Sequence, residues 1–163
     1  MLQKKNISIS FEEYSSIDDL CEVERKLCLE AVKALDSSHS PYSGFRVGAA
    51  VQLESGKIVY GSNQENVAYP SGLCAERVAL FTIGSSYPND KIIRMAITAH
   101  TKDFEIKLPV TSCGACLQVM AEYEKRQTQP IHVLFYCVNG AVIRTEGIKS
   151  LLPFAFSETR LEK

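Results

Sequence analysis

Apolar side chains recur at helical spacing in several stretches of this chain of 163 residues. In residues 16–35 they fall at every third or fourth position, namely at Leu20, Val23, Leu27, Ala31 and Ala34. Because this spacing puts the apolar side chains on one face, it predicts an amphipathic helix. Ser16, with Asp19 three residues later, predicts a capping box at the start of that helix.

Helical spacing returns in the second and last thirds of the chain. Residues 73–83 repeat the pattern, and we expect Val78 and Phe81 to face the core. Residues 112–125 lead into a further helix, and a short one is predicted near 148–152. Helical segments therefore alternate with segments of a different pattern.

Those other segments have the composition of β-strands. Strands are predicted at 45–53, 57–60, 92–99, 130–138 and 141–145. Two pairs of strands are joined by dipeptides typical of hairpin turns, Ser55-Gly56 and Asn139-Gly140. Helices alternating with strands and hairpins predict an α/β fold, a mixed sheet with helices on both faces in three layers (α/β/α). The length and the hydrophobic fraction of 45% fit a single domain over residues 1–163.

Charge and composition narrow the class of partner. The formal net charge is −1, and the chain has no Trp and no basic run. Proteins that bind DNA or RNA usually carry a basic face, so we expect no nucleic-acid partner. Met1 to Ser10 does not resemble a signal peptide and no apolar run is long enough to span a membrane, so we expect a cytoplasmic protein without membrane contact.

The six cysteines fall into two groups. A disulfide framework is not expected in a chain of this size without a leader. We expect Cys21, Cys28 and Cys137, which lie in predicted helix or strand, to be small buried hydrophobic residues. The other three lie in turn-rich segments beside helix starts.

Cys74, Cys113 and Cys116 have the arrangement of a catalytic zinc site. Cys113 and Cys116 form a C-x-x-C pair, and Cys74 adds a third thiolate from a separate segment. Three protein ligands leave a fourth position for water, as catalysis by zinc requires. Two alternatives stay open: a closed structural zinc with a fourth ligand, and thioredoxin-like redox chemistry of the C-x-x-C pair. The structural zinc is not favoured, because none of the three histidines, His39, His100 and His132, has metal-site spacing. Redox chemistry is not favoured either, because it leaves Cys74 and Glu76 without a role.

Glu76 and Arg77, which follow Cys74-Ala75, have side chains suited to proton transfer and charge compensation at a zinc site. Glu76 lies two residues beyond Cys74, so its carboxylate should point past the metal and toward the water, where it can accept and return protons. Three thiolates and Zn²⁺ carry a formal charge of −1, and Arg77 could compensate it by donating to a thiolate sulfur. The alternative for Arg77 is an ordinary surface arginine.

Several motifs together resemble the cytidine deaminases. Cys74-Ala75-Glu76-Arg77, followed by Cys113-Gly114-Ala115-Cys116, is similar to the H-x-E…P-C-x-x-C signature of zinc deaminases, in the variant with three cysteines. The resemblance covers residues 41–156 and includes the segments YSGFRVGAA (42–50), NQEN (63–66) and LLP (151–153). It implies one Zn²⁺ per chain, a five-stranded mixed sheet covered by helices, and a homotetramer.

The resemblance also implies roles for individual residues. Asn63 and Glu65 match residues that bind the ribose hydroxyls, and Phe45 matches an aromatic residue that packs against the pyrimidine. The backbone N–H of Ala75 matches a donor to the 2-oxo group. Phe156 resembles an aromatic residue that reaches the site of a neighbouring subunit, with Phe154 as the alternative at that position.

Two positions depart from the family pattern. Ser112 stands where relatives usually have Pro, and Leu117 stands where they usually have Arg. Without the proline, the loop before Cys113 regains a backbone N–H and loses a fixed φ. Loss of the arginine leaves more of the charge compensation to Arg77.

These features predict a soluble enzyme of pyrimidine salvage. We expect it to deaminate cytidine and 2′-deoxycytidine hydrolytically, giving the uridines and ammonia, with Glu76 as proton shuttle and zinc as cofactor. The alternatives are a deaminase of another aminated nucleoside or base, and a zinc-binding module without catalytic activity.

Overall fold

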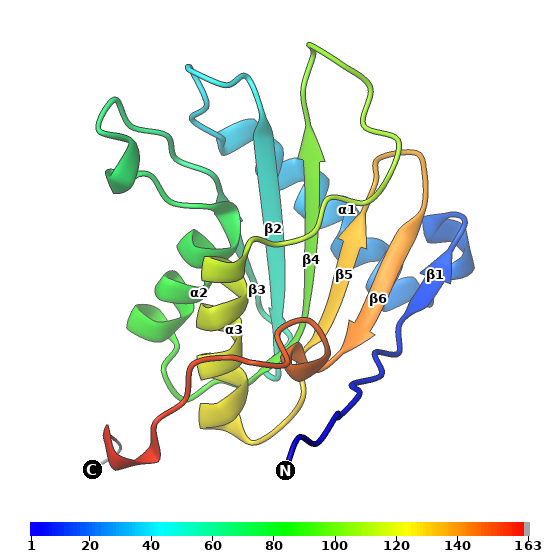
Figure 1. Cartoon of the computed structure of the whole chain (residues 1–163). Helices are drawn as coiled ribbons and strands as arrows, with labels where there is room; N and C mark the ends of the chain where they lie inside the picture. The colour runs from blue at the N-terminus through cyan, green and yellow to red at the C-terminus, as the bar shows by residue number, and fades with distance from the viewer. Residues whose placement is uncertain (162–163) are drawn as a thin grey trace.

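The computed structural model describes residues 1–161 and contains a six-stranded mixed sheet with the strand order β1-β6-β5-β4-β2-β3 (Figure 1). Only β4 and β5 run parallel, and the other neighbours are antiparallel. The strands are β1 (Glu12–Tyr14), β2 (Arg46–Leu53), β3 (Ile58–Ser62), β4 (Ile92–His100), β5 (His132–Tyr136) and β6 (Val142–Glu146). The helices that cover this sheet are α1 (Glu22–Ala34), α2 (Ala75–Ser86) and α3 (Gly114–Gln127).

The helices form a layer on each side of the sheet, as predicted (Figure 1). Helix α1 buries Leu27, Cys28 and Ala31 against one face. Helices α2 and α3 bury Leu80 and Met120 against the other. The mixed α/β architecture with three layers is therefore confirmed.

The expected five strands are corrected to six, because the short strand β1 joins the edge of the sheet. It pairs antiparallel with β6, with Glu12 opposite Arg144. Arg144 forms an ion pair with Glu12, and its other guanidinium nitrogen lies 3.1 Å from both oxygens of the buried Glu24. The strand has only three residues and its partner lies far away in the sequence, so no local pattern predicted it.

Two expectations for α1 and its start need correction. The Ser16–Asp19 capping box is present, but it caps a short 3₁₀ turn at Ile17–Asp19. The α-helix begins at Glu22, with Cys21 at its N-cap. Cys21 is exposed, which contradicts its predicted burial, whereas Cys28 and Cys137 are buried as predicted.

The face that α2 turns to the core also differs from the prediction. Ala79, Leu80 and Ile83 are buried, whereas Phe81 is 46% exposed and Val78 is half-buried. Small residues let the helix lie directly on β3: a Cβ on Gly61 would come within 2.1 Å of the Ala75 carbonyl oxygen. That close approach fixes the rotation of α2 and directs Phe81 outward.

The sheet topology places the first residues of α2 and α3 at the same end of the strands. Strands β3 and β4 are both antiparallel to β2, so they point the same way. Helix α2 follows β3 and α3 follows β4, so both helices begin beyond the same end of the sheet (Figure 1). Across residues 1–161, no helix has the length and apolarity needed to cross a membrane.

Candidate metal centre

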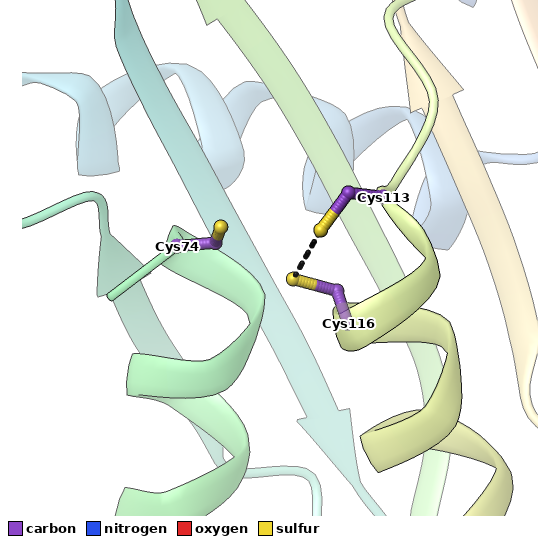
Figure 2. Close-up of side chains that lie close together, drawn as sticks. All are labelled: Cys74, Cys113 and Cys116. Carbon is purple, nitrogen blue, oxygen red and sulfur yellow. Dashed lines mark hydrogen bonds between the residues drawn. The ribbon is translucent and has the colours of Figure 1, made fainter. Parts of the chain in front are cut away.

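The three predicted ligands meet between the N-termini of α2 and α3. Cys74 is the N-cap of α2, Cys113 is the N-cap of α3, and Cys116 is the third residue of α3. Figure 2 shows their side chains directed into the space between the two helices. Their sulfur atoms all lie within 4.8 Å of one another, and the Cys113 and Cys116 sulfurs are 3.6 Å apart.

This donor set fits a zinc ion. Sulfurs bound to a tetrahedral zinc at about 2.3 Å lie about 3.8 Å apart, so small side-chain movements would suffice. The free N–H groups and the positive dipole ends of two helices favour thiolates there. Within the described part of the chain, no histidine, aspartate, glutamate or further cysteine joins the three thiols as a ligand group. The expected open position is therefore preserved, and the closed structural site finds no fourth ligand among residues 1–161.

The thiols already share a proton network. The pKa of Cys74 is lowered to about 6, chiefly by a hydrogen bond from Cys116 and also by the neighbouring Arg77. The pKa of Cys116 is raised in turn by its bond to Cys74 and by burial. Of these two thiols, Cys74 is therefore the one that ionises more readily.

Arg77 lies against the thiols rather than on an open surface. Its Nη2 donates to the Cys74 sulfur at 3.8 Å, and this hydrogen bond raises the pKa of the guanidinium. The Nε atom of Arg77 is buried and has no hydrogen-bond partner among residues 1–161. The charge compensation predicted for Arg77 is consistent with this position.

Glu76 lies next to the thiols and is the second residue of α2. It is 4% exposed, and no described residue forms a hydrogen bond or an ion pair with its carboxylate. A buried carboxylate without a protein partner is costly unless something else binds it. Both the metal site and Glu76 face a cavity of about 680 Å³ that is open on one side.

Some of the predicted substrate-binding residues line the cavity, and others do not. Asn63 and Glu65 line it, together with Glu76, Arg77 and two of the cysteines (Cys74 and Cys113). Phe45 does not line it: the ring is half-buried and stacks on Phe104, with 6.3 Å between centroids. Ala75, the first residue of α2, is fully buried and is not among the residues that line the cavity.

Phe156 lies outside the cavity and is 73% exposed. Its backbone is fixed to α3, because the Gln118 side chain accepts from the Phe156 N–H at 2.8 Å and donates to its carbonyl at 2.9 Å. Phe154 is 84% exposed and has no such anchor in the described chain. The C-terminal segment therefore presents Phe156 in a defined place on the surface.

The cavity also contains residues that sequence reasoning missed. Tyr42 and Tyr69 lie at its open side in an edge-to-face pair, and Ser43 and Val47 line its wall. The only local signal was the turn chemistry of residues 41–44, which predicts a bend without revealing what the bend contacts.

The two departures from the family pattern lie beside the metal centre. The Ser112 hydroxyl is buried without a hydrogen-bond partner in residues 1–161. Leu117 is half-buried and packs against the core shared by α2 and α3. The apolar side chain at this position therefore contributes to helix packing instead of charge.

Comparison with known proteins gives a consistent result. The family model described as "Cytidine and deoxycytidylate deaminase zinc-binding region" matches residues 21–130. A cytidine deaminase of Halalkalibacterium halodurans is 44% identical over 131 residues, which cover 80% of this chain and 92% of the relative. A cytidine deaminase of Sporosarcina psychrophila is 39% identical over 136 residues, covering 83% of this chain and 93% of the relative.

A solved structure agrees with the fold. The crystal structure of cytidine deaminase from Burkholderia pseudomallei matches with a TM-score of 0.69 and 34% sequence identity. The match covers 80% of this chain and 97% of that one.

Proposed function

This chain belongs to the cytidine and deoxycytidylate deaminase family, and from that premise we propose that it hydrolyses cytidine and 2′-deoxycytidine to the corresponding uridines and ammonia. It is a hydrolase with a zinc-binding region, and the reaction fits pyrimidine salvage. The observation that carries the proposal is the buried Glu76 carboxylate beside three thiols at two helix N-termini, in one cavity.

In this proposal Cys74, Cys113 and Cys116 hold the zinc ion, and Arg77 offsets their charge. When bound, zinc acts as a Lewis acid that makes a water molecule nucleophilic near neutral pH. The chain's own residues then have to move the protons and orient the ring.

Glu76 is the proton shuttle. Its carboxylate takes one proton from the attacking water and delivers it to N3 of the pyrimidine as the new C4–O bond forms. It then takes the second proton and delivers it to the amino group, so that the C4–N bond breaks and ammonia leaves. The carboxylate is regenerated, and the reaction consumes one water molecule. The lack of any protein partner for Glu76 in residues 1–161 supports this role, because both oxygens are free to exchange protons.

The start of α2 also offers a donor to the ring. Ala75 is the first residue of the helix, where the backbone N–H has no intrahelical acceptor. We assign this N–H to the 2-oxo group of the pyrimidine. The pyrimidine contact of Phe45 stays a prediction, since its ring stacks outside the cavity.

The sugar is assigned to Asn63 and Glu65, and their existing bonds limit what they can recognise. Counting the bonds among residues 1–161, Asn63 Oδ1 accepts from Ser38 and Val47, and Nδ2 donates once, to Phe45 O, so a single N–H donor remains. On the same count, three bonds to Glu65 leave one acceptor site, on Oε1. One donor and one acceptor satisfy one hydroxyl group rather than two, which supports turnover of both cytidine and 2′-deoxycytidine.

We further propose one catalytic unit per chain, a homotetrameric assembly, and a cytoplasmic location. Free thiols at all six cysteines fit a reducing compartment. Exposed aromatic side chains at Phe81, Phe154 and Phe156 fit an assembly of several copies, because such residues are common at interfaces.

The test is an assay of the zinc-loaded protein with cytidine, 2′-deoxycytidine, cytosine and adenosine, following absorbance and ammonia release. We expect rapid conversion of the two cytidine nucleosides only. Glu76→Gln should keep its zinc and lose activity by at least about 100-fold, the lower range for a general acid–base group. Turnover of a different amine would select the alternative deaminase, and bound zinc without any turnover would select the non-catalytic module.

A further inference from the structure

We propose that Ser43 is a positioning residue for sugar recognition, because its hydroxyl holds the Glu65 carboxylate so that one oxygen lone pair faces the sugar. This inference rests on the proposed function and names a residue that sets how tightly the site recognises a sugar hydroxyl. Ser43 and Glu65 lie on different segments, 22 residues apart, and both line the cavity beside the metal centre.

The Glu65 carboxylate is held at both oxygens by the loop that carries Ser43. Its Oε2 accepts from the backbone N–H of Tyr42 at 2.9 Å and of Ser43 at 3.3 Å. Its Oε1 accepts from the Ser43 hydroxyl. The hydrogen bond from the Ser43 hydroxyl is the main cause that lowers the pKa of Glu65. The Glu65 side chain therefore accepts the sugar hydroxyl in its ionised form.

The Ser43 hydroxyl is itself fixed from the other side. Its oxygen accepts from the Phe45 N–H at 3.0 Å, which directs the hydroxyl hydrogen toward Glu65. Between these residues, Gly44 has φ +63, a left-handed conformation that gives the loop its sharp bend. The bend therefore turns the Phe45 N–H back onto the Ser43 hydroxyl oxygen, which leaves the hydroxyl hydrogen for Glu65.

The hydrogen bonds to Glu65 have two different roles. Those to Oε2 hold the loop that carries Ser43, and the one to Oε1 orients the oxygen that accepts from the sugar. The two backbone N–H groups bind Oε2 whatever the side chain at position 43. Among residues 1–161, the Ser43 hydroxyl alone binds Oε1, the oxygen that keeps a free lone pair for the sugar. Without the hydroxyl, Oε1 gains a second free lone pair, and water competes for the position of the sugar hydroxyl. The loop, by contrast, keeps its anchors to Oε2 and, through Phe45 O, to Asn63.

The experiment compares Ser43→Ala, Ser43→Thr and the wild-type protein with four substrates: cytidine, 2′-deoxycytidine, 3′-deoxycytidine and 2′,3′-dideoxycytidine. We expect Ser43→Ala to lower kcat/KM about tenfold, mainly through KM, for substrates that carry the recognised hydroxyl. The recognised hydroxyl is taken to be the 2′ or the 3′ group; the dideoxy substrate, which lacks both, should keep its wild-type kcat/KM. Ser43→Thr keeps the hydroxyl and should restore the discrimination. Ser40→Ala is the matched loop control, because its side chain contacts Ser38 at 3.3 Å and makes no bond to Glu65.

An equal loss with all four substrates would show that Ser43 merely supports the loop, and would overturn the inference. Unchanged or improved kinetics of Ser43→Ala would overturn it as well. Failure of the proposed function would look different, since the wild-type protein would then turn over none of the four cytidine nucleosides.

Discussion

At the scale of single residues, two exposed cysteines occupy equivalent positions in two helices. Cys21 is the N-cap of α1 and Cys113 is the N-cap of α3, and neither side chain is buried. Only Cys113 has two other thiols within 4.8 Å. The difference in function must therefore come from the neighbours, and it can be tested without disturbing the core.

We expect Cys113→Ser to weaken zinc binding by more than about 100-fold, beyond the usual cost of losing an outer-shell partner of a metal ligand. Cys21→Ser should bind zinc as the wild type does. Titration with a chromophoric chelator measures both affinities. A Cys113→Ser protein with wild-type affinity would remove this residue from the metal site.

The residues of the metal centre were predictable because the signal is local. Cys74, Glu76 and Arg77 fall within one helical turn, and the C-x-x-C pair within another, so spacing groups them as candidates for one site. The partners of Glu65 were not predictable in the same way. Ser43 and Tyr42 reach it from 22 and 23 residues away, and no spacing rule connects two loops across such a separation.

At the scale of elements, the position of α2 depends on the absence of a side chain on β3. A Cβ on Gly61 would meet the Ala75 carbonyl oxygen at 2.1 Å and the Ala79 nitrogen at 2.6 Å. Both are backbone atoms that cannot rotate away, so any added side chain must push α2 from the sheet. The same helix carries Cys74 and Glu76 at its start.

Gly61→Ala should therefore destabilise the protein by about 1–3 kcal/mol, the usual cost of overpacking. It should also lower kcat by about 100-fold, because displacement of catalytic groups by about 1 Å has that effect. Gly114→Ala is the stability control: its Cβ would meet nothing within 4 Å, and stability should change by less than about 0.5 kcal/mol. Urea unfolding and steady-state kinetics supply the two measurements, and equal stability of the two variants would contradict the packing argument.

A second element-scale prediction concerns the ion pair that joins β1, β6 and α1. Glu24 is buried, so loss of Arg144 would leave its carboxylate without a counter-charge. We expect Arg144→Ala to cost about 2–4 kcal/mol, somewhat less than a fully buried pair because the Arg144 side chain is 28% exposed. Glu12→Ala should cost at most about 1 kcal/mol, because the Glu12 side chain is 55% exposed. Chemical denaturation of both variants compares the two costs, and similar values would argue against the dominance of Glu24.

Some helices and strands were predictable from local sequence, and others depend on contacts with residues far away in the chain. The β5–β6 hairpin was predicted from Asn139-Gly140 and is present, and Asn139 has a positive φ of 60°; Gly140 lacks the positive φ that a two-residue Asn-Gly turn also needs, so the turn differs from the predicted type. The outward rotation of α2 was not predictable, since apolar residues lie on several of its sides and only contact with Gly61 selects the buried one. Strand β1 has three residues, two of them glutamates, and its pairing depends on Arg144, which is far away in the sequence.

At the scale of the whole molecule, the chain presents apolar surface that its own cavity does not use. Phe156 is 73% exposed and is held on α3 by both its N–H and its carbonyl. A large apolar side chain fixed in an exposed position is typical of a contact with another molecule. In the proposed homotetramer, the Phe156 side chain would contact the cavity of a neighbouring copy.

If Phe156 completes a neighbouring site, two defective variants should restore each other when they assemble together. Phe156→Ala should lower kcat/KM by about tenfold, as expected for loss of one aromatic contact at the site. Glu76→Gln should be nearly inactive. In a mixed assembly, a chain with an intact Glu76 can receive Phe156 from its neighbour, so co-refolded mixtures should exceed the summed activities of the two separate proteins.

Phe154→Ala provides the matched control for this experiment, because Phe154 is also exposed but lacks the Gln118 anchor. Its mixture with Glu76→Gln should show only the activity expected from dilution. Affinity capture through a tag on one variant, with the untagged variant recovered alongside it, establishes that the two chains have assembled together, and light scattering gives the size of the assembly. Tetramers without restored activity would mean that Phe156 serves only its own chain, whereas restoration by Phe154→Ala and not by Phe156→Ala would transfer the role to Phe154. Restoration with Phe156→Ala alone would make the functional unit the assembly, with the proton shuttle and the aromatic residue of each site on different chains.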